Sequence, residues 1–442
     1  MIREIPEVAA LDAPHGWIRI PPEVDVPVTR RVRRIIDTPQ FRRLARISQL
    51  GLVSLVYPAA NHSRFEHLLG VYRLGLLYLK RLSYDPRFSE SISAADGELF
   101  IVAALLHDLG HWPFCHPIED IRLADVPRHE AFARAFLTEG ELADALGEDW
   151  NIEPRRIIEL LSGDAPDNRT RILSSLLSGP IDIDKMDYLA RDSLHAGVPY
   201  GRHFDQARLI SSLCLNERGD GLAITEKGKT AAELMVFARY VMFSEVYWHH
   251  GVRSATAMLQ RAFYLLKAKL DLETLFRMTE TNMIAELQTA AEGAPAAELL
   301  AGLFGPTRRL YKRLAEYSFS DEPELYGQLA RRPYPWLAAC AGEFAAVLNE
   351  TRTATIEPHE ILFDAPPTER EVEFDIEVYS SKQNRYRALA EVSPVVRTLA
   401  KEQFDDYVKR VRIFAHPRII DELRDRPDLA DCLLEAVRRT NG

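Results

Sequence analysis

The chain has 442 residues, of which 47% are hydrophobic, enough for a sizeable core and, by length, for two or three structural units. Its formal net charge of -10 argues against a general nucleic-acid coat protein, although a local basic pocket is still compatible with it. The chain opens without a charged-then-apolar leader, and no apolar run is long enough to span a bilayer, which favours a cytoplasmic protein. The four cysteines lack C-x-x-C spacing and indicate reduced thiols.

Apolar periodicity predicts helices over the first two thirds of the chain. Residues 28–50 indicate two short helices, because Pro39 interrupts the pattern after Thr38. Residues 64–82 carry a broad apolar face, and a further helix runs from about residue 95 to residue 107. The remaining helical patterns cover residues 130–137, 155–161, 171–177, 181–194 and a long amphipathic stretch, 231–270.

The last third changes character. β-Branched, alternating runs occur at residues 353–363, 372–379 and 411–414, and helical patterns at residues 402–410 and 419–438. We therefore expect a mainly α protein with a small C-terminal mixed α/β lobe. The expected divisions are an N-terminal segment with helices packed on the core (1–60), a helical domain with its helical extension (61–350) and the lobe (351–442).

Two adjacent side chains that can bind metal, His107 and Asp108, follow the apolar run 100–106, which predicts a buried helix. Burying a carboxylate with an imidazole is costly unless something pairs with them, and a cation is a strong candidate. His67 and Asp184 complete a set of two imidazoles and two carboxylates, which suits a divalent ion such as manganese, iron, magnesium or zinc.

The alternative is that this pair is structural, as a single buried His-Asp pair usually is. In this chain, however, His67 precedes the pair, and His111 and His116 follow it closely. A cluster of this many titratable groups near helix ends is hard to explain as packing in a hydrophobic core. The pattern therefore favours a metal site.

The order His…His-Asp…Asp resembles the metal-dependent phosphohydrolases of the HD-domain superfamily. The surrounding sequence resembles the deoxynucleoside triphosphate triphosphohydrolases, in particular the SAM-and-HD-domain branch and its bacterial relatives. The match runs from about residue 14 to residue 263, and its segments are Ile36-Asp37-Thr38-Pro39-Gln40-Phe41, Gln49-Leu50, Arg64-Phe65-Glu66-His67, residues 107–116 and residues 184–192. This resemblance implies an HD-domain helical core that hydrolyses a deoxynucleoside triphosphate to deoxynucleoside and inorganic triphosphate.

The resemblance also implies a metal ion and positively charged side chains that hold the triphosphate. The residues that match metal ligands are His67, His107, Asp108 and Asp184. They would hold one divalent ion, with manganese, iron, magnesium, nickel and zinc all open, and an additional magnesium would accompany the triphosphate. A polyanionic leaving group needs fixed cations, and the residues that match these are Arg64, Lys185 and Arg239.

Histidines and carboxylates match the acid–base residues of the family. His116 corresponds to the general acid, which would protonate the departing sugar oxygen. His111 and His129 correspond to assisting histidines, and Glu130 would orient one of them. Glu119 stands where the family has an aspartate. For His129 an equally good interpretation is a cap on the following helix.

Five residues match positions around the nucleoside. Gln49, Leu50 and Asp192 correspond to residues near the 3′-hydroxyl, and Tyr188 and Tyr247 to aromatics packed against the sugar. A tyrosine tight against the 2′ carbon would exclude a ribose hydroxyl. Tyr247 fits the core of a long helix equally well.

Some positions depart from the family. In members that need an activator, a glutamine and an arginine after Asp-Thr-Pro read a guanine nucleotide at a subunit interface. Here these positions are Arg42 and Ala45, which argues against guanine-specific activation.

Two other functions stay open: an HD phosphohydrolase acting on another nucleotide or on a nucleic-acid end, and a non-catalytic nucleotide sensor. As partners, the resemblance implies the deoxynucleoside triphosphate and further copies of the chain, in a dimer or tetramer. A membrane partner is not expected, and nucleic acid is not indicated.

Overall fold

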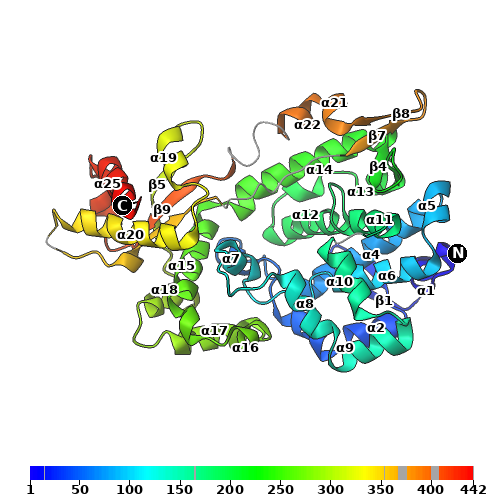
Figure 1. Cartoon of the computed structure of the whole chain (residues 1–442), viewed down its shortest axis with the longest axis horizontal. Coiled ribbons are helices and arrows are strands. Elements are labelled where there is room, and N and C mark those ends of the chain that lie inside the picture. The colour runs from blue at the N-terminus through cyan, green and yellow to red at the C-terminus, as the bar shows by residue number, and fades with distance from the viewer. Residues whose placement is uncertain (14, 164–165, 353, 367–375, 400–407, 442) are drawn as a thin grey trace. The chain divides into compact units, whose positions relative to one another are not determined.

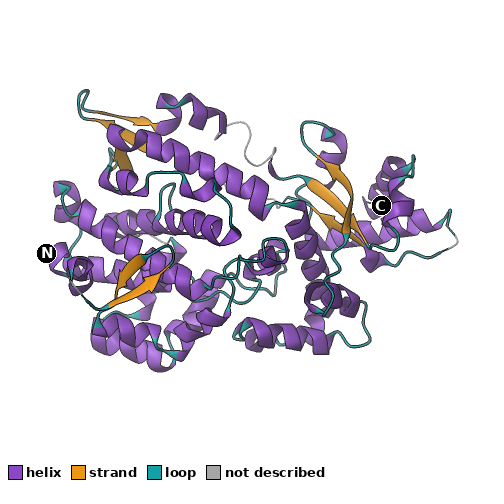
Figure 2. Cartoon of the chain, turned by 180° about the vertical axis from the view of Figure 1, so that it is seen from behind, coloured by secondary structure: helices purple, strands orange, loops and turns teal. Residues whose placement is uncertain are grey.

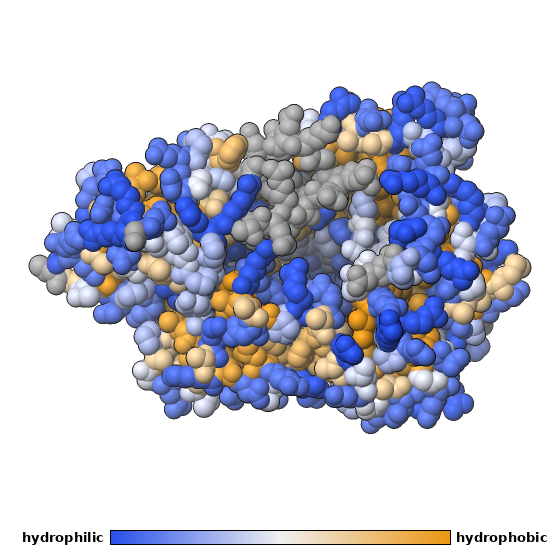
Figure 3. All heavy atoms as spheres, viewed as in Figure 1, coloured by the Kyte–Doolittle hydropathy of each residue, from blue (hydrophilic) through white to orange (hydrophobic). Residues whose placement is uncertain are grey.

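The computed structural model describes residues 1–13, 15–163, 166–352, 354–366, 376–399 and 408–441. Helices dominate these residues, and the sheets are small (Figure 1, Figure 2). Hydrophilic side chains cover most of the face drawn in Figure 3, with smaller apolar areas between them. Among the described residues, none of the helices has both the length and the apolar character that a bilayer crossing requires. The predicted fold class, mainly α with a C-terminal mixed-sheet region, is confirmed.

The chain forms two compact units. The first comprises Met1–Pro113, Pro127–Met242 and Glu373–Lys401, and the second comprises Phe114–Val126, Phe243–Val372 and Glu402–Gly442. The residues expected to form one C-terminal lobe, 351–442, therefore contribute to both units.

The first unit carries most of the helices predicted from the sequence, together with several short helices that were not predicted. They are α1 (Pro6–Ala9), α2 (Arg30–Ile36), α3 (Pro39–Arg42), α4 (Arg64–Leu82), α5 (Pro86–Ser91), α6 (Ala94–Leu106), α8 (His129–Leu137), α9 (Gly140–Ala145), α10 (Pro154–Ser162), α11 (Asn168–Leu177), α12 (Ile183–Ala196), α13 (Gln206–Ser211), α14 (Lys229–Met242), α21 (Leu389–Val392) and α22 (Pro394–Thr398). The break predicted at Thr38-Pro39 separates α2 from α3, and α4 covers the predicted residues 64–82.

Side-chain caps set where the central helices begin. Ser63 accepts a hydrogen bond from the backbone N–H of Glu66 at the start of α4. Ser93 and Asp96 form a reciprocal capping box at the start of α6, and Asp182 caps α12. Such caps satisfy backbone donors that have no partner within the helix. α4 packs against both α6 and α12, so these three helices form the centre of the unit (Figure 1).

Two sheets flank these helices in the first unit. β1 (Trp17–Ile20) and β2 (Val24–Pro27) pair antiparallel. The second sheet has the order β3-β4-β7-β8. β4 (Leu222–Thr225) runs antiparallel to β3 (Leu213–Leu215) and parallel to β7 (Glu377–Ser380). β7 in turn pairs antiparallel with β8 (Arg385–Ala388). The run predicted at residues 372–379 thus supplies β7, although residues 372–375 lie outside the described residues.

The second unit combines helices with a three-stranded antiparallel sheet, β5-β9-β6. Its helices are α7 (Cys115–Asp120), α15 (His250–Leu266), α16 (Leu272–Phe276), α17 (Glu280–Ala290), α18 (Ala296–Phe304), α19 (Pro323–Leu329), α20 (Tyr334–Asn349), α24 (Ile420–Arg424) and α25 (Leu429–Asn441). Its strands are β5 (Lys312–Tyr317), β6 (Ile361–Asp364) and β9 (Val411–Ala415). Apolar side chains of α20, α25 and this sheet share one buried core.

The structure corrects two predicted helices and leaves one outside its described residues. The single helix predicted for residues 231–270 is wrong, because a π-type turn (Phe243–Tyr247) follows α14 and α15 begins only at His250. There the N–H of Trp248 bonds to the carbonyl of Phe243, five residues back, which interrupts the α-helical pattern. The helix predicted for residues 419–438 divides into α24 and α25. Most of the helix predicted for residues 402–410 lies outside the described residues.

A glycine permits the close approach of α8 to the turn that follows α6. A Cβ atom added to Gly110 would lie 2.0 Å from the carbonyl oxygen of His129 and 2.6 Å from the backbone nitrogen of Ala133. Both neighbours are backbone atoms, which cannot rotate away as a flexible side chain can. Gly110 is therefore required for this approach, which places His129 beside the turn.

We expect Gly110→Ala to lower the free energy of unfolding by roughly 1–3 kcal/mol, because the added methyl group overpacks against backbone. Thermal unfolding of the purified variant measures this loss. Gly147→Ala is the matched control in the same unit, because a Cβ atom there would meet nothing within 4 Å. Equal unfolding temperatures for the two variants would contradict the packing argument.

Candidate metal centre

Three elements of the first unit bring the four predicted metal ligands together. His67 lies in the first turn of α4 and Asp184 in the first turn of α12, while His107 and Asp108 directly follow α6. Because α4 packs against both other helices, ligands that are far apart in the sequence meet in one place.

The facing atoms of these residues lie close together. Oδ1 of Asp184 is 3.1 Å from Nε2 of His67 and 3.6 Å from Nε2 of His107. Oδ1 of Asp108 is 3.3 Å from the same nitrogen of His107. One ligand atom each from His67, His107 and Asp184 lies within 4.8 Å of the others, which is the spacing of a candidate metal site.

The hydrogen bond made by Nδ1 of His107 leaves its other ring nitrogen, Nε2, available to bind a cation. Its Nδ1 lies 3.0 Å from the carbonyl oxygen of Ala104, which can only accept, so Nδ1 carries the proton. Nε2 is buried and makes no hydrogen bond among the described residues. In the neutral ring, that nitrogen has its lone pair beside the carboxylates of Asp108 and Asp184. Imidazole nitrogens with carboxylate oxygens form a donor set that suits manganese, iron or zinc, so the residues fit a divalent ion.

The buried charges of the cluster shift one another's pKa. Burial opposes the charged form of His67, but hydrogen bonds with Asp184 and Asp187 outweigh it and raise its pKa to about 10. Burial likewise opposes ionisation of Asp108, but the charges of His107 and Arg64 outweigh it and lower its pKa to about 2. The carboxylates are thus ionised, and a proton on His67 occupies the position that a metal cation would take.

The side chain of Asp184 is the most exposed of the four. It is 34% exposed, against 1% for His67, 14% for His107 and 10% for Asp108. Solvent therefore reaches the cluster mainly on the side of Asp184.

Two of the three residues predicted to hold the triphosphate form ion pairs with acidic neighbours. Nη1 of Arg64 lies 2.5 Å from Oδ2 of Asp108, and Nζ of Lys185 pairs with the carboxylate of Asp182. The third, Arg239, is buried on α14, where it lines a small pocket together with Pro180 and other residues of the first unit.

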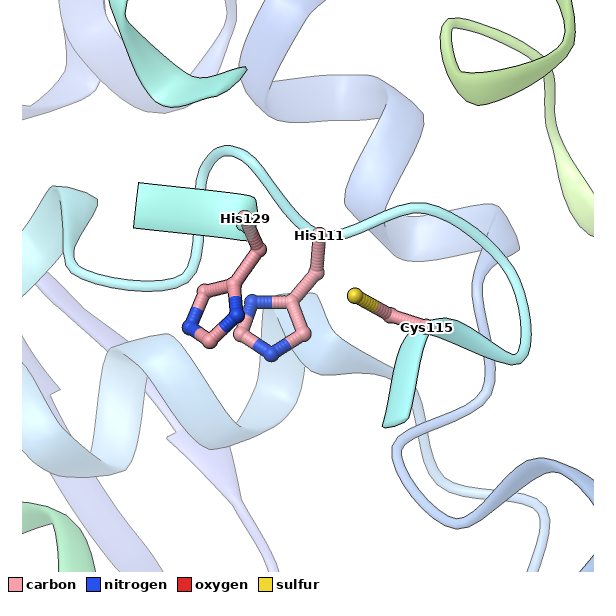
Figure 4. A group of neighbouring side chains, drawn as sticks. All are labelled: His111, Cys115 and His129. Carbon is pink, nitrogen blue, oxygen red and sulfur yellow. The ribbon is translucent and has the colours of Figure 1, made fainter. Parts of the chain in front are cut away.

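The two histidines predicted to assist catalysis lie side by side. The ring centres of His111 and His129 are 3.8 Å apart, and Figure 4 shows His129 at the start of α8 with His111 on the loop between α6 and α7. Nδ1 of His111 is 3.3 Å from Oδ1 of Asp108, which connects this pair to the metal ligands. Nε2 of His129 is 3.4 Å from Glu130, the predicted orienting carboxylate.

Three predicted site residues belong to the second unit. His116 and Glu119 lie on α7, with His116 Nδ1 3.8 Å from a carboxylate oxygen of Glu119. The side chain of His116 is 62% exposed. Tyr247 ends the π-type turn before α15, and its ring packs 5.1 Å from that of Phe243.

Two of the predicted nucleoside residues of the first unit, Asp192 and Gln49, contact His62. Nε2 of His62 lies 2.9 Å from Oδ1 of Asp192, and its carbonyl oxygen accepts a hydrogen bond from the backbone N–H of Gln49. Leu50, the next residue, is half-buried. On α12, burial raises the pKa of Tyr188, while the positive charge of Arg239 opposes that rise.

Five polar residues that connect to His67 or to Asp192 were not predicted from the sequence: His62, Glu66, Asp187, Arg191 and His195. Three of them lie on α12 three or four residues apart, continuing the face that begins at Asp184. This spacing is a signal that was present in the sequence, because such residues share one side of a helix.

Comparisons with known proteins agree with this geometry. A family model described as an HD domain matches residues 64–192, and one described as an HD associated region matches residues 204–432. An uncharacterized protein of Methanocaldococcus jannaschii is 31% identical over 405 residues, covering 91% of this chain and 79% of that protein.

Two further relatives extend the comparison. The deoxynucleoside triphosphate triphosphohydrolase SAMHD1 of Gallus gallus is 28% identical over 379 residues, covering 74% of this chain. This match spans only 58% of the length of that relative. Among solved structures, a hypothetical protein from Aquifex aeolicus has a TM-score of 0.69 at 29% identity, covering 92% of this chain and 98% of that one.

All four candidate ligands fall inside the segment that matches the HD domain, and the associated region accounts for more than half of the chain. With a relative matched along most of both chains, these findings establish the family. The chain belongs to the HD-domain phosphohydrolase superfamily and carries an HD domain followed by an HD-associated region.

Proposed function

We propose that the protein hydrolyses deoxynucleoside triphosphates to the deoxynucleoside and inorganic triphosphate, using one divalent ion held by His67, His107, Asp108 and Asp184. The observation that carries this proposal is the close approach of the Asp184 carboxylate to the facing Nε2 atoms of both histidines. The distant similarity to deoxynucleoside triphosphate triphosphohydrolases supports this choice of substrate class.

When bound by these four residues, the ion would supply Lewis-acid chemistry and an activated water for hydrolysis at the α-phosphorus. The protein side chains would bind and orient the substrate. Arg64, Lys185 and Arg239 are proposed to neutralise the triphosphate, with Arg64 and Lys185 exchanging their present carboxylate partners for phosphate oxygens. Gln49, Leu50 and Asp192 would contact the sugar, and Tyr188 and Tyr247 would pack against it.

Proton transfer to the leaving oxygen is proposed for His116, whose exposed ring is accessible to a substrate. His111 and His129 would assist it, oriented by the carboxylates of Asp108 and Glu130. Glu119 is proposed to orient His116.

The ion pairs of Arg64 and Lys185 also favour a second candidate. Because both cations are balanced by carboxylates, the cluster also suits an HD phosphohydrolase whose substrate carries fewer phosphates. The position of bond cleavage separates the two candidates.

Incubating the purified protein with each deoxynucleoside triphosphate, singly and in mixtures, with manganese or magnesium is expected to yield free nucleoside and inorganic triphosphate. Chromatography identifies both products. Monophosphate with pyrophosphate would reject the proposed cleavage position while retaining a phosphohydrolase. Activity only in mixtures would indicate activation by a second nucleotide.

We expect His107→Ala to abolish turnover and to weaken manganese binding at least tenfold, because the substitution removes a ligand atom from the cluster. Calorimetric titration of the metal and product analysis measure the two effects. The control is His359→Ala in the second unit, which removes a half-buried histidine that lies outside this cluster. A His107→Ala variant with unchanged manganese affinity would remove His107 from the ligand set.

Metal affinity is expected to rise with pH, because a coordinating imidazole must first lose its proton. Without metal, the pKa of His67 is raised to about 10, so at neutral pH binding must displace a proton. At pH values below that pKa, the affinity for the metal should rise on the order of tenfold per pH unit for each proton displaced. Manganese titrations at several pH values, in buffers of different ionisation enthalpy, measure both the affinity and the released protons. An affinity independent of pH would contradict this exchange.

A further inference from the structure

The ring of His67 is held from its far side by a residue without an assigned role. Nε2 of His67 faces Asp184, and its other nitrogen, Nδ1, lies 2.9 Å from Oδ2 of Asp187. Because a carboxylate can only accept, Nδ1 carries the proton and Nε2 is left with its lone pair in the neutral ring. This is the tautomer that a ligand bound through Nε2 requires.

Asp187 is itself fixed by two hydrogen bonds from Arg191, one turn further along α12. Nε of Arg191 donates to Oδ2 of Asp187 and Nη2 donates to Oδ1, each at 2.8 Å. This paired geometry determines the plane of the carboxylate as well as its position. All three side chains are buried, with His67 at 1%, Asp187 at 6% and Arg191 at 6% exposure.

Arg191 is anchored in turn by groups other than Asp187. Its Nη1 donates to Oε1 of Glu66 at 2.7 Å and to the carbonyl oxygen of Pro21 at 3.2 Å. Glu66 also lies 2.9 Å from Nε2 of His195, so its carboxylate has two partners. The guanidinium is therefore held on both sides and cannot rotate without breaking several charged hydrogen bonds.

A glycine on α4 leaves the space that this ion pair occupies. A Cβ atom added to Gly70 would lie 2.0 Å from Oδ1 of Asp187 and 2.4 Å from Nη2 of Arg191. Gly70 follows His67 by three residues on the same helix, so the glycine and the ligand face the same partner on α12. Any larger residue at position 70 would displace the carboxylate that holds His67.

We propose that Asp187 is a positioning residue, which fixes the orientation and tautomer of the metal ligand His67, and that Arg191 holds Asp187 in the space left by Gly70. This inference rests on the metal centre of the proposed function but not on its substrate. Carboxylates that hold the second nitrogen of a metal-binding histidine raise the basicity of the ligand and restrict its rotation.

Asp187→Asn tests the proposal, because it preserves the shape of the side chain and removes its charge. We expect the dissociation constant for manganese to rise about 10–100-fold, the range observed when such partners are removed. A purely structural role predicts no change, since the asparagine fills the same volume. Calorimetric titration measures the affinity, and thermal unfolding in EDTA confirms that the variant is folded.

Glu159→Gln is the matched control, because Arg155 and Glu159 form an ion pair with the same i,i+4 spacing on α10, in which Arg155 is 84% exposed. Its affinity for manganese should equal that of the wild type. An Asp187→Asn affinity within about twofold of the wild type would overturn the proposal. A wild-type protein without affinity for manganese would overturn it together with the metal centre.

Gly70→Ala provides a second, independent test. Alone it should weaken manganese binding, because the new methyl group displaces Asp187. In the Asp187→Ala background the clash with the carboxylate is absent, and the remaining clash is with Nη2 of Arg191, which no longer acts on His67 through Asp187. The same substitution should therefore cause little further loss of manganese affinity. Equal losses in both backgrounds would overturn the role given to Gly70. If the wild type binds manganese but releases no triphosphate from any deoxynucleoside triphosphate, the substrate assignment fails and the positioning role stands.

Discussion

The burial of charge between α4, the end of α6 and α12 is the constraint on which the site depends. Two imidazoles and two carboxylates lie within a few ångströms of one another, nearly all of them shielded from water. Ionised groups in such a place require partners of opposite charge. Arg64 supplies one positive charge, and either a proton on His67 or a divalent ion supplies another. The cluster is thus a site where protons and metal compete.

Several charged residues of the site lie on facing sides of α4 and α12. α12 presents Asp184, Asp187, Arg191 and His195 along one face, and α4 presents His67 and Gly70 toward it. The candidate ligands His67 and Asp184 therefore share one pair of helices with residues that hydrogen-bond to them or to their partners. A displacement of α12 relative to α4 would change the distances from His67 to both Asp184 and Asp187. The geometry of the candidate metal site therefore depends on the packing of these two helices.

Three imidazoles around the site, those of His107, His67 and His62, each have one ring nitrogen beside a different acceptor. A backbone carbonyl holds Nδ1 of His107, the carboxylate of Asp187 holds Nδ1 of His67, and Asp192 lies beside Nε2 of His62. The partner decides which nitrogen is free and how basic it is. The hydrogen bond to the charged carboxylate of Asp187 contributes to the raised pKa of the His67 ring.

Prediction from the sequence was correct for the helical class, the bounds of α4, the break at Pro39 and the four residues that converge as candidate ligands, because apolar periodicity and residue type are local properties. It failed where hydrogen bonding overrides periodicity, as at the π-type turn that ends the long helix predicted for residues 231–270. Tertiary packing determines which carboxylate holds which histidine, that Arg64 pairs with Asp108, and that Gly70 and Gly110 must lack side chains. Each of these contacts joins atoms from separate helices, and their distances follow from packing that no single segment encodes.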